Sequence, residues 1–393
     1  MGMVPGISHW TADSGHIDLR EITLGELLRE QAGRYKERLA VVFDEPALNL
    51  HVQWTYAELD ARVDALSKAL LAIGVNNGDR VAVMSPNRPE WVLLEYALAR
   101  IGAVLVTVNP AFRYSELDYL LKQGRVTGFF AIGEFRGFDL GDLIDTMLAS
   151  GAANGAVKAI EYPDLRHLIQ IGPTPIPGAM TFEDLLAKGW QTDDKAFFER
   201  IATVLPHDVV QIQYTSGTTG NPKGVMLTHF GTVNNAILAG DRAGYRETDV
   251  MVSAMPFFHT AGCVCNVIGM AAVGGCLVAL ESFDAARTLD LIETYGGTIT
   301  NAVPTMYVRM LQDPALLKGH RDISGWRIAY TGGAAIPPSL MRELKEKVGA
   351  DPVTANGVGH GLPEPVHEDL EADAARRVSL GVEEDLGPAH PVG

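Results

Sequence analysis

The chain has 393 residues, of which 47% are hydrophobic and 20% are charged. This composition is typical of a soluble globular protein with a large core and two or three folding units. The formal net charge is −16 at pH 7, and no run of lysines and arginines interrupts it. Nucleic acid is therefore excluded as an expected partner, because polyphosphate backbones are repelled by an acidic surface.

The N-terminal sequence MGMVPGISHW has no basic flank before an apolar core, so it predicts no secretory signal peptide. Gly2 is not a predicted lipidation site, because Gly6 stands where Ser or Thr is required. The three cysteines, Cys263, Cys265 and Cys276, form no C-x-x-C pair and have no histidines at zinc spacing. We interpret them as buried, reduced thiols of a cytoplasmic protein.

Helices and strands alternate along the first third of the chain. Over residues 54–73, apolar residues recur three and four positions apart, which predicts an amphipathic helix with Thr55 and Glu58 as its capping box. RVAVMSP then predicts a buried strand, and residues 88–102 and 103–108 predict the next helix and strand. SELDYLLKQ and GFFAIG repeat this order. We therefore expect an α/β fold with a largely parallel sheet.

From about residue 133 to residue 206 the pattern weakens, which predicts a connection between two similar sheet units. Strand-like runs then return as VVQIQYT, DVMVSAMP, CLVALE, TITNAVP and WRIAYTGG. Residues 262–280 are apolar enough to resemble a membrane span, but Gly274 and Gly275 divide them. We expect a helix, a turn and a strand in a packed core there, and no membrane span.

The most informative segment is YTSGTTGNPKG, residues 214–224, which joins the strand VVQIQ to the apolar run VMLTH. Its glycines allow backbone N–H groups to converge on an anion, and its hydroxyls add donors. Lys223 supplies a positive charge for a phosphate. The common P-loop is spaced differently, because here Pro222 precedes the lysine and Gly224 follows it. A Ser/Thr/Gly turn without a ligand is the alternative.

The full string resembles the phosphate-binding loop of the adenylate-forming superfamily, which includes acyl-CoA synthetases, luciferases and adenylation domains of peptide synthetases. The segments WTYAELDARVDALSKALLAIGVNNGDRVAVMSPNRPEW, MPFFHTAGC and VPTMY resemble further family segments in order and spacing, over about residues 20–350. The resemblance implies a layered αβαβα large domain of two mainly parallel sheet units with a smaller β-rich subdomain. This AMP-binding domain is expected over residues 1–352, with units of roughly 1–170 and 171–352.

Enzymes of this family convert a carboxylate and ATP into an acyl-adenylate and pyrophosphate, and then pass the acyl group to a thiol. FFHTAG and VPTMY look closer to the fatty-acid–CoA ligase branch than to amino-acid activators. The resemblance implies ATP, Mg²⁺ and CoA as cofactors, and a cytoplasmic protein is expected. Homodimerisation and peripheral membrane contact are left open. Lys223 is expected to act in catalysis by relieving charge on the leaving pyrophosphate. By resemblance, the residues that contact the β- and γ-phosphates are Thr215, Ser216, Gly217, Thr218, Thr219, Gly220 and Lys223.

The resemblance places His259, in the sequence FFHT, beside the acyl group near the adenylate, and a packed core histidine is the alternative. Gly333 and Ala334 end the strand RIAY and are expected to border the adenine and the acyl group. A plain strand-to-helix turn is the alternative for these two residues. Apolar residues after the histidine could line the acyl pocket or belong to the ordinary core: Cys263, Val264, Val267 and Met270.

The resemblance weakens after residue 350. The family motif Tyr-Gly-x-Thr-Glu supplies an adenine-stacking ring and a magnesium-binding glutamate, and its nearest equivalent here is HGLPE. Only Gly361 and Glu364 agree, so Glu364 is the one candidate metal ligand. The acidic tail 353–393 lacks Phe, Tyr and Trp and is expected to be disordered or poorly packed. The mobile C-terminal domain of the family, with its lysine, is not recognisable.

Three explanations fit these missing parts: a truncated or frameshifted product, a fragment completed by another chain, or a diverged binding protein. The change of composition in the tail favours the first. An acyl-CoA synthetase is thus the first hypothesis, and an aryl-CoA ligase or an amino-acid adenylation domain is its neighbour. A catalytically incompetent nucleotide-binding protein is the opposing hypothesis. A chain that aggregates through an exposed sheet edge is a further alternative.

Overall fold

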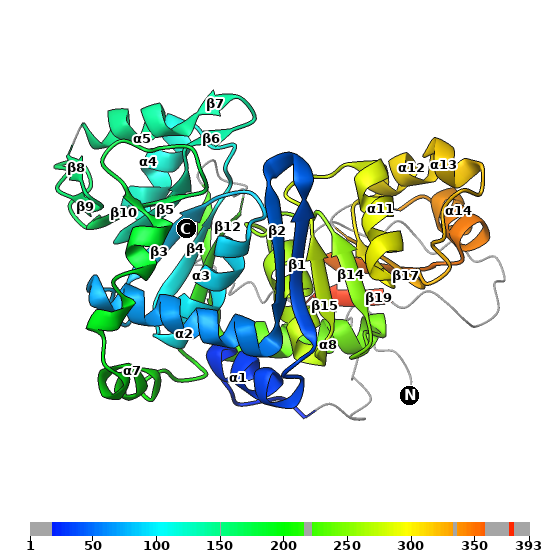
Figure 1. Cartoon of the computed structure of the whole chain (residues 1–393), viewed down its shortest axis with the longest axis horizontal. Coiled ribbons are helices and arrows are strands. Elements are labelled where there is room, and N and C mark those ends of the chain that lie inside the picture. Colours follow the sequence, from blue (N-terminus) through cyan, green and yellow to red (C-terminus); the bar gives the residue numbers. More distant parts are fainter. Residues whose placement is uncertain (1–17, 150, 216–221, 333–335, 358–376, 381–393) are drawn as a thin grey trace, which may run out of the picture.

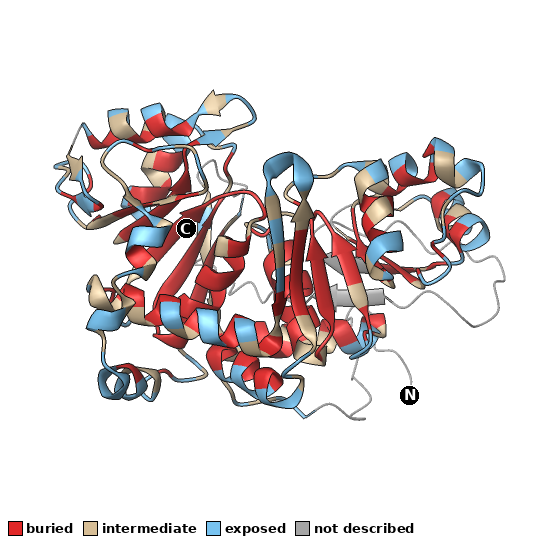
Figure 2. Cartoon of the chain, in the orientation of Figure 1, coloured by how far each residue is buried: buried red, intermediate tan, exposed pale blue. Residues whose placement is uncertain are grey.

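Two β-sheets lie side by side and carry most of the buried residues, with helices over their outer faces and between them (Figure 1). Figure 2 shows that burial is concentrated in the central strands of both sheets, whereas the outward helix faces are exposed. This is the layered α/β architecture that the order of helices and strands predicts. The computed structural model describes residues 18–149, 151–215, 222–332, 336–357 and 377–380.

The first sheet contains nine strands among the described residues. In spatial order they are β13 (Lys223–Thr228), β12 (Val209–Thr215), β4 (Val104–Val108), β3 (Arg80–Met84), β5 (Gly128–Ile132), β10 (His167–Ile171), β9 (Ala156–Val157) and β8 (Ala152–Ala153), with β11 (Met180–Thr181) beside β10. From β12 to β10 the strands run parallel, and β13 returns antiparallel at the edge. Their near-continuous apolar runs suit a sheet that is covered on both faces.

The second sheet contains eight described strands. In spatial order they are β19 (Arg377–Leu380), β18 (Asp351–Gly357), β17 (Ile328–Gly332), β16 (Ile299–Asn301), β14 (Val250–Ser253), β15 (Cys276–Ala279), β1 (Leu39–Glu45) and β2 (Leu50–Thr55). Neighbours pair in parallel except β2, which pairs antiparallel with β1. A separate small hairpin joins β6 (Glu134–Phe135) to β7 (Phe138–Asp139).

The helices fill the connections between these strands. They are α1 (Leu24–Arg34), α2 (Tyr56–Ala72), α3 (Pro89–Arg100), α4 (Tyr114–Gln123), α5 (Leu140–Leu148), α6 (Phe182–Leu186), α7 (Asp194–Ile201), α8 (His229–Ala243), α9 (Thr260–Gly262), α10 (Gly269–Val273), α11 (Ala285–Tyr295), α12 (Pro304–Leu311), α13 (Pro314–Leu317) and α14 (Pro338–Val348). Two 3₁₀ turns, η1 (Pro46–Leu48) and η2 (Gly189–Gln191), and a π-helix, η3 (Cys263–Ile268), complete them.

Helix α3 is the middle layer of the molecule. Nearly all of its residues are buried, which a helix reaches only when protein covers it on every side. The carboxyl of Glu95 accepts a hydrogen bond of 2.7 Å from Gln211 of β12 in the first sheet. On the other side, the Trp91 ring lies 5.4 Å from Phe257, which follows β14 of the second sheet. The helix therefore joins the two sheets through its side chains.

The second sheet takes its strands from two separate parts of the chain. Strands β1 and β2, from the N-terminal part, lie in the second sheet, whereas β12 and β13 lie in the first. The boundary expected at about residue 170 therefore does not separate the sheets, and a division into folding units there stays a prediction. Residues 133–206 contain more structure than expected, because His167–Ile171 forms β10 between β5 and β9. A five-residue apolar run is too short for periodicity to identify.

Several local predictions are confirmed. Thr55 and Glu58 form the capping box of α2, with N–H···O distances of 3.2 and 2.8 Å. The apolar stretch 262–280 is a helix, a turn and the strand β15, and Gly274 ends its helix at a φ of +76°. A Cβ on Gly274 would lie 2.1 Å from the Tyr35 ring, so a side chain does not fit there. Among the described helices, none is long and apolar enough to cross a membrane.

The poorly packed tail was expected to begin at residue 353, but the ordered chain continues beyond that residue. Strand β18 runs to Gly357, and Val353 is buried opposite Tyr330 of β17. Strand β19 then adds a further parallel neighbour. Composition missed β18 because the run DPVTANG is short and opens with an acid and a proline. Residues 358–376 and 381–393 lie outside the described residues.

Candidate functional site

The segment YTSGTTGNPKG joins β12 to β13 at the edge of the first sheet. Thr215, the last residue of β12, is paired in register with Lys223, the first residue of β13, and both side chains are exposed. A hydroxyl and an ammonium group therefore stand side by side where the segment leaves the sheet. Ser216, Gly217, Thr218, Thr219 and Gly220, the other residues expected to bind phosphate, lie outside the described residues.

Helix α4 contacts both ends of this segment. The Tyr214 hydroxyl donates a hydrogen bond to Oε1 of Gln123. The Tyr119 hydroxyl donates to the carbonyl oxygen of Pro222 over 3.2 Å. Burial raises the pKa of Tyr214 to about 12, with a smaller contribution from Tyr119, so its hydroxyl keeps its proton at neutral pH. Tyr119 and Gln123 lie outside the motif and were not predicted to contact it, although their four-residue spacing places both on one face of a helix.

Two glycines make room for the Tyr214 ring. A Cβ on Gly224 would lie 3.3 Å from Cζ of Tyr214 and 3.0 Å from Cγ2 of Ile212. A Cβ on Gly124, at the end of α4, would lie 3.0 Å from the Tyr214 hydroxyl oxygen. Both distances are shorter than ordinary van der Waals contact. Gly224 thus has a packing role in addition to any role in phosphate binding.

His259 follows β14 and begins α9. Its Nδ1 accepts a hydrogen bond of 3.1 Å from the Ala261 N–H, so a neutral ring carries its proton on Nε2. The side chain is exposed on one side, while the protein that surrounds the rest of the ring lowers its pKa by desolvation. Among the described residues no carboxylate pairs with His259. The neutral ring therefore offers an N–H donor at Nε2.

A buried polar network holds the segment after β14 over the second sheet. The Ser253 hydroxyl donates to the Asn301 carbonyl over 2.6 Å, and Asn266 donates to the same hydroxyl over 3.0 Å. The Asn301 amide donates to Oδ1 of Asn266 over 2.6 Å and to the Ala261 carbonyl over 3.2 Å. Asn301 ends β16, next to β17. His259 is thereby held near the carboxyl ends of β16 and β17, although Gly333 and Ala334 themselves lie outside the described residues.

Asn87 brings the carboxyl ends of the two sheets together. It lies just after β3 of the first sheet and is buried. Its side-chain amide donates to the carbonyl oxygens of Met255 and Leu280, over 3.0 and 2.9 Å, beyond the ends of β14 and β15. Its Oδ1 accepts from the Phe257 N–H over 2.8 Å. The His259 segment and the carboxyl edge of the first sheet therefore face a common region, which is where open α/β sheets bind ligands.

The apolar residues after His259 belong to the core. The four candidates for a pocket lining are all buried in the larger hydrophobic cluster: Cys263, Val264, Val267 and Met270. The first part of the helix expected there, Cys263–Ile268, is a π-helix instead of an ordinary α-helix. All three cysteines are free and buried, as predicted. Burial raises the pKa of Cys265 to about 11 and that of Cys276 to about 12, so both remain protonated at neutral pH.

The described residues contain no group of three or more His, Cys, Asp or Glu side chains that could hold a metal ion. Glu364, the one candidate ligand from the sequence, lies outside the described residues. What these residues offer to a nucleotide is instead a cation and a hydroxyl, Lys223 and Thr215, at an exposed strand end. That donor set suits an anionic oxygen group such as a polyphosphate.

Comparison with known proteins gives one family. The protein-family model described as "AMP-binding enzyme" matches residues 28–360 of the chain. YngI of Bacillus subtilis (strain 168), provisionally named an acyl-CoA synthetase, is 34% identical over 339 residues, which are 86% of this chain and 61% of that protein. The mitochondrial medium-chain acyl-CoA ligase ACSF2 of Mus musculus is 33% identical over 344 residues, 85% of this chain and 55% of that protein.

A solved structure shares the fold. The anthranilate CoA ligase AuaEII, in complex with anthranoyl-AMP, aligns with a TM-score of 0.72 at 23% identity. The alignment covers 86% of this chain and 60% of that one. The chain thus spans about 55–61% of the length of these three proteins.

Proposed function

The chain belongs to the AMP-binding enzyme family, and from this we propose that it activates a carboxylic acid with ATP to an acyl-adenylate and then to an acyl-CoA. The observation that carries the proposal is the β12–β13 hairpin, which pairs Thr215 with Lys223 at an exposed strand end. That pair lies at the ends of a segment whose sequence, YTSGTTGNPKG, is rich in donors for phosphate oxygens.

The residues of the loop would act on the leaving group. Attack of a carboxylate oxygen on the α-phosphorus breaks the bond to pyrophosphate, on which negative charge then develops. Lys223, Thr215 and the backbone and hydroxyl donors of residues 216–220 would hold that charge in place. Mg²⁺, when bound, would neutralise part of the same charge, and Glu364 is proposed as one of its ligands.

The acyl-adenylate would lie toward the second sheet. Gly333 and Ala334 are proposed to border it, because they follow the carboxyl end of β17. His259 would lie beside the acyl group, where its neutral ring can donate one hydrogen bond through Nε2. A neutral donor can orient a carboxylate or carbonyl oxygen without holding it as tightly as a cation.

A medium-chain fatty acid is the proposed substrate class, since the ACSF2 relative is named a medium-chain acyl-CoA ligase. CoA is the proposed acceptor, and the cytoplasm is the proposed location. An aryl acid is the neighbouring substrate class, because the family contains ligases for both kinds of acid. Amino acids are a third class that the same assay can address.

The test is a panel of acids. Purified full-length chain is mixed with MgATP, CoA and one acid at a time, with acids of six to twelve carbons, benzoate, anthranilate and several amino acids as the panel. Pyrophosphate release is followed with and without each acid. We expect release that depends on a medium-chain acid and saturates with it. Release with aryl or amino acids alone would reassign the substrate class, and no release with any acid would overturn the activity.

A second candidate function is nucleotide binding without turnover. It is favoured by the sequence HGLPE at residues 360–364, which lacks the tyrosine and threonine of the family motif. A ligand that binds only the folded state raises the melting temperature. A rise in melting temperature with MgATP, in the absence of pyrophosphate release with any acid, would support this second function.

A further inference from the structure

Helix α4 meets the ends of the β12–β13 segment through a single face. Tyr119 and Gln123 are four residues apart, so their side chains lie one above the other along the helix. Tyr119 bonds to Pro222, which directly precedes Lys223, at 3.2 Å. Gln123 accepts from Tyr214, which directly precedes Thr215. One helix thus holds both the entry and the exit of the segment.

β13 pairs with β12 and with no other described strand. β13 is an edge strand whose residues are exposed or half-buried, and Met226 in it is 68% exposed. Pro222 has no N–H group, so its carbonyl oxygen is its only backbone hydrogen-bonding group. The Tyr119 hydroxyl occupies that group. This bond acts where the chain enters β13, next to Lys223, and adds to the pairing of β13 with β12.

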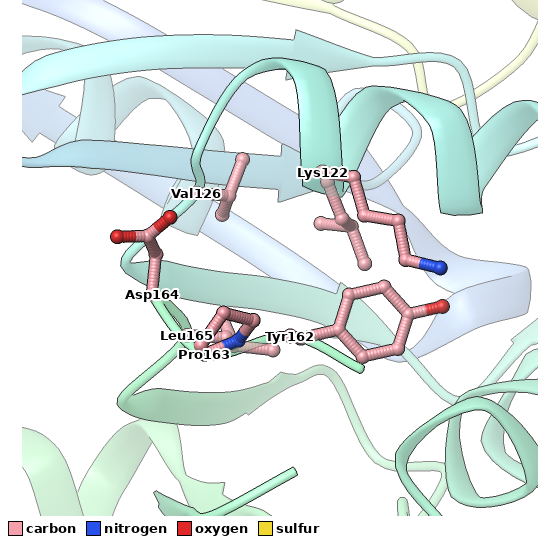
Figure 3. Close-up of a pocket in the computed structure, with 7 residues that line it drawn as sticks. Lys122, Val126, Tyr162, Pro163, Asp164 and Leu165 are labelled. Atoms are coloured by element: carbon pink, nitrogen blue, oxygen red, sulfur yellow. The ribbon is translucent and has the colours of Figure 1, made fainter. Parts of the chain in front are cut away.

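The adjacent face of α4 is fixed to a different part of the protein. The Tyr162 hydroxyl donates to Asp118 over 2.6 Å, and the Lys122 ammonium lies 2.9 Å from Asp118 and 3.4 Å from Glu161. Figure 3 shows the Lys122 side chain above the Tyr162 ring, where a shallow pocket separates the helix from the segment before β10; the ammonium lies 5.2 Å from the ring centroid. These contacts hold α4 in place but do not reach the hairpin.

We propose that Tyr119 and Gln123 are positioning residues for ATP: α4 sets the place of Thr215 and Lys223 through Tyr214 and Pro222. The inference rests on the proposed function of the loop, and it assigns to α4 a role that the motif itself does not contain. Because Lys223 is expected at the β- and γ-phosphates, the effect should fall on ligands that carry those phosphates. Ligands that carry only an α-phosphate should be spared.

The test compares two phenylalanine variants of the full chain. Tyr119→Phe removes only the hydroxyl that donates to Pro222. Tyr162→Phe removes a hydroxyl that donates to Asp118 on the adjacent face of the same helix. The affinities for MgATP and for AMP are measured by calorimetry. We expect Tyr119→Phe to weaken MgATP binding about three- to tenfold, as the loss of one hydrogen bond implies, with AMP affinity unchanged. Tyr162→Phe should leave both affinities unchanged.

Equal weakening of MgATP and AMP, or equal effects of the two variants, would overturn the proposal in favour of a general structural role. If Tyr119→Phe does not fold, Gln123→Leu tests the same face through Tyr214 with the same expectation. Amide exchange without nucleotide separates this inference from the function. Should wild type bind no ATP, the function fails, but Tyr119→Phe must still exchange faster than Tyr162→Phe at residues 223–225. Equal exchange there would contradict the positioning role.

Discussion

His229 shows how one buried residue can set the acid sensitivity of the fold. Its ring is fully buried at the start of α8, where Nδ1 accepts the Leu24 N–H over 3.1 Å. Nε2 has no partner among the described residues. Desolvation lowers the pKa of this histidine to about 4, since a protonated ring would lose its hydration and point an N–H at that of Leu24.

The free energy of unfolding should therefore fall as the pH is lowered from about 6.5 toward about 4. The histidine binds a proton near pH 6.5 in the unfolded chain and near pH 4 in the folded chain. Below pH 6.5 the unfolded state binds more protons than the folded state. The contribution of the neutral histidine to the free energy of unfolding is therefore complete above pH 6.5 and is lost as the pH falls toward 4. Between pH 7 and pH 5 we expect this residue to lower the free energy of unfolding by about 2 kcal/mol.

Denaturant unfolding at pH 7 and pH 5 measures this difference. In His229→Asn, whose side-chain oxygen can accept the Leu24 N–H, the pH-dependent loss should shrink by that amount. His207→Asn is the matched control, because His207 is exposed beside Glu21. An unchanged pH dependence in His229→Asn would contradict the assignment.

At the scale of secondary structure, Gly274 and Gly275 form the turn between α10 and β15, and a Cβ on either would overlap a neighbouring residue. Gly274 has a φ of +76°, and a Cβ there would meet the Tyr35 ring at 2.1 Å. Gly296 ends α11 with a similar φ of +64°, but a Cβ there would meet nothing within 4 Å. A side chain at either position would strain the backbone, but only a side chain at Gly274 would also overlap another residue. Comparing the two positions therefore separates the cost of backbone strain from the cost of steric overlap.

Gly274→Ala should lower the free energy of unfolding more than Gly296→Ala does. Both variants carry the cost of a non-glycine residue at positive φ, about 1 kcal/mol. Overlap with Tyr35 should add a further 1–3 kcal/mol, roughly the range for overpacking a core. Chemical denaturation of the two variants beside wild type gives both values. Equal losses would mean that Tyr35 moves aside without cost.

Much of the element order could be predicted from the sequence, because long periodic segments such as 54–73 carry both a period and a cap. Strand β10 could not, because its five residues lie among glycines and prolines that give no period. The π-helix η3 was also missed, since its apolar residues fit an ordinary helix equally well. In the site, the loop was visible as a motif, but Tyr119, Gln123 and Asn87 act from distant segments, and only the folded chain brings them there.

At the scale of the whole molecule, the second sheet combines strands from both ends of the described chain, and the first sheet is built from the part between them. β1 and β2 precede the strands of the first sheet in the chain and β14 to β19 follow them, so the second sheet is not built from a continuous part of the chain. The carboxyl ends of the sheets meet at Asn87, with Thr215 at the carboxyl end of β12 in the first sheet and His259 beyond β14 in the second. This arrangement supports the proposed role of the loop, because a nucleotide bound there would lie near an acyl group bound beside His259.

Calorimetric titration of MgATP measures whether the β12–β13 segment binds the phosphates of ATP. The wild-type chain, Lys223→Ala and Lys195→Ala are compared, where Lys195 is an exposed lysine on α7 paired only with Glu199 in the described structure. We predict saturable binding at one site, weakened about tenfold or more in Lys223→Ala and unchanged in Lys195→Ala. Equal affinities in all three proteins, or no saturable binding by folded wild type, would show that this segment does not bind the phosphates of ATP.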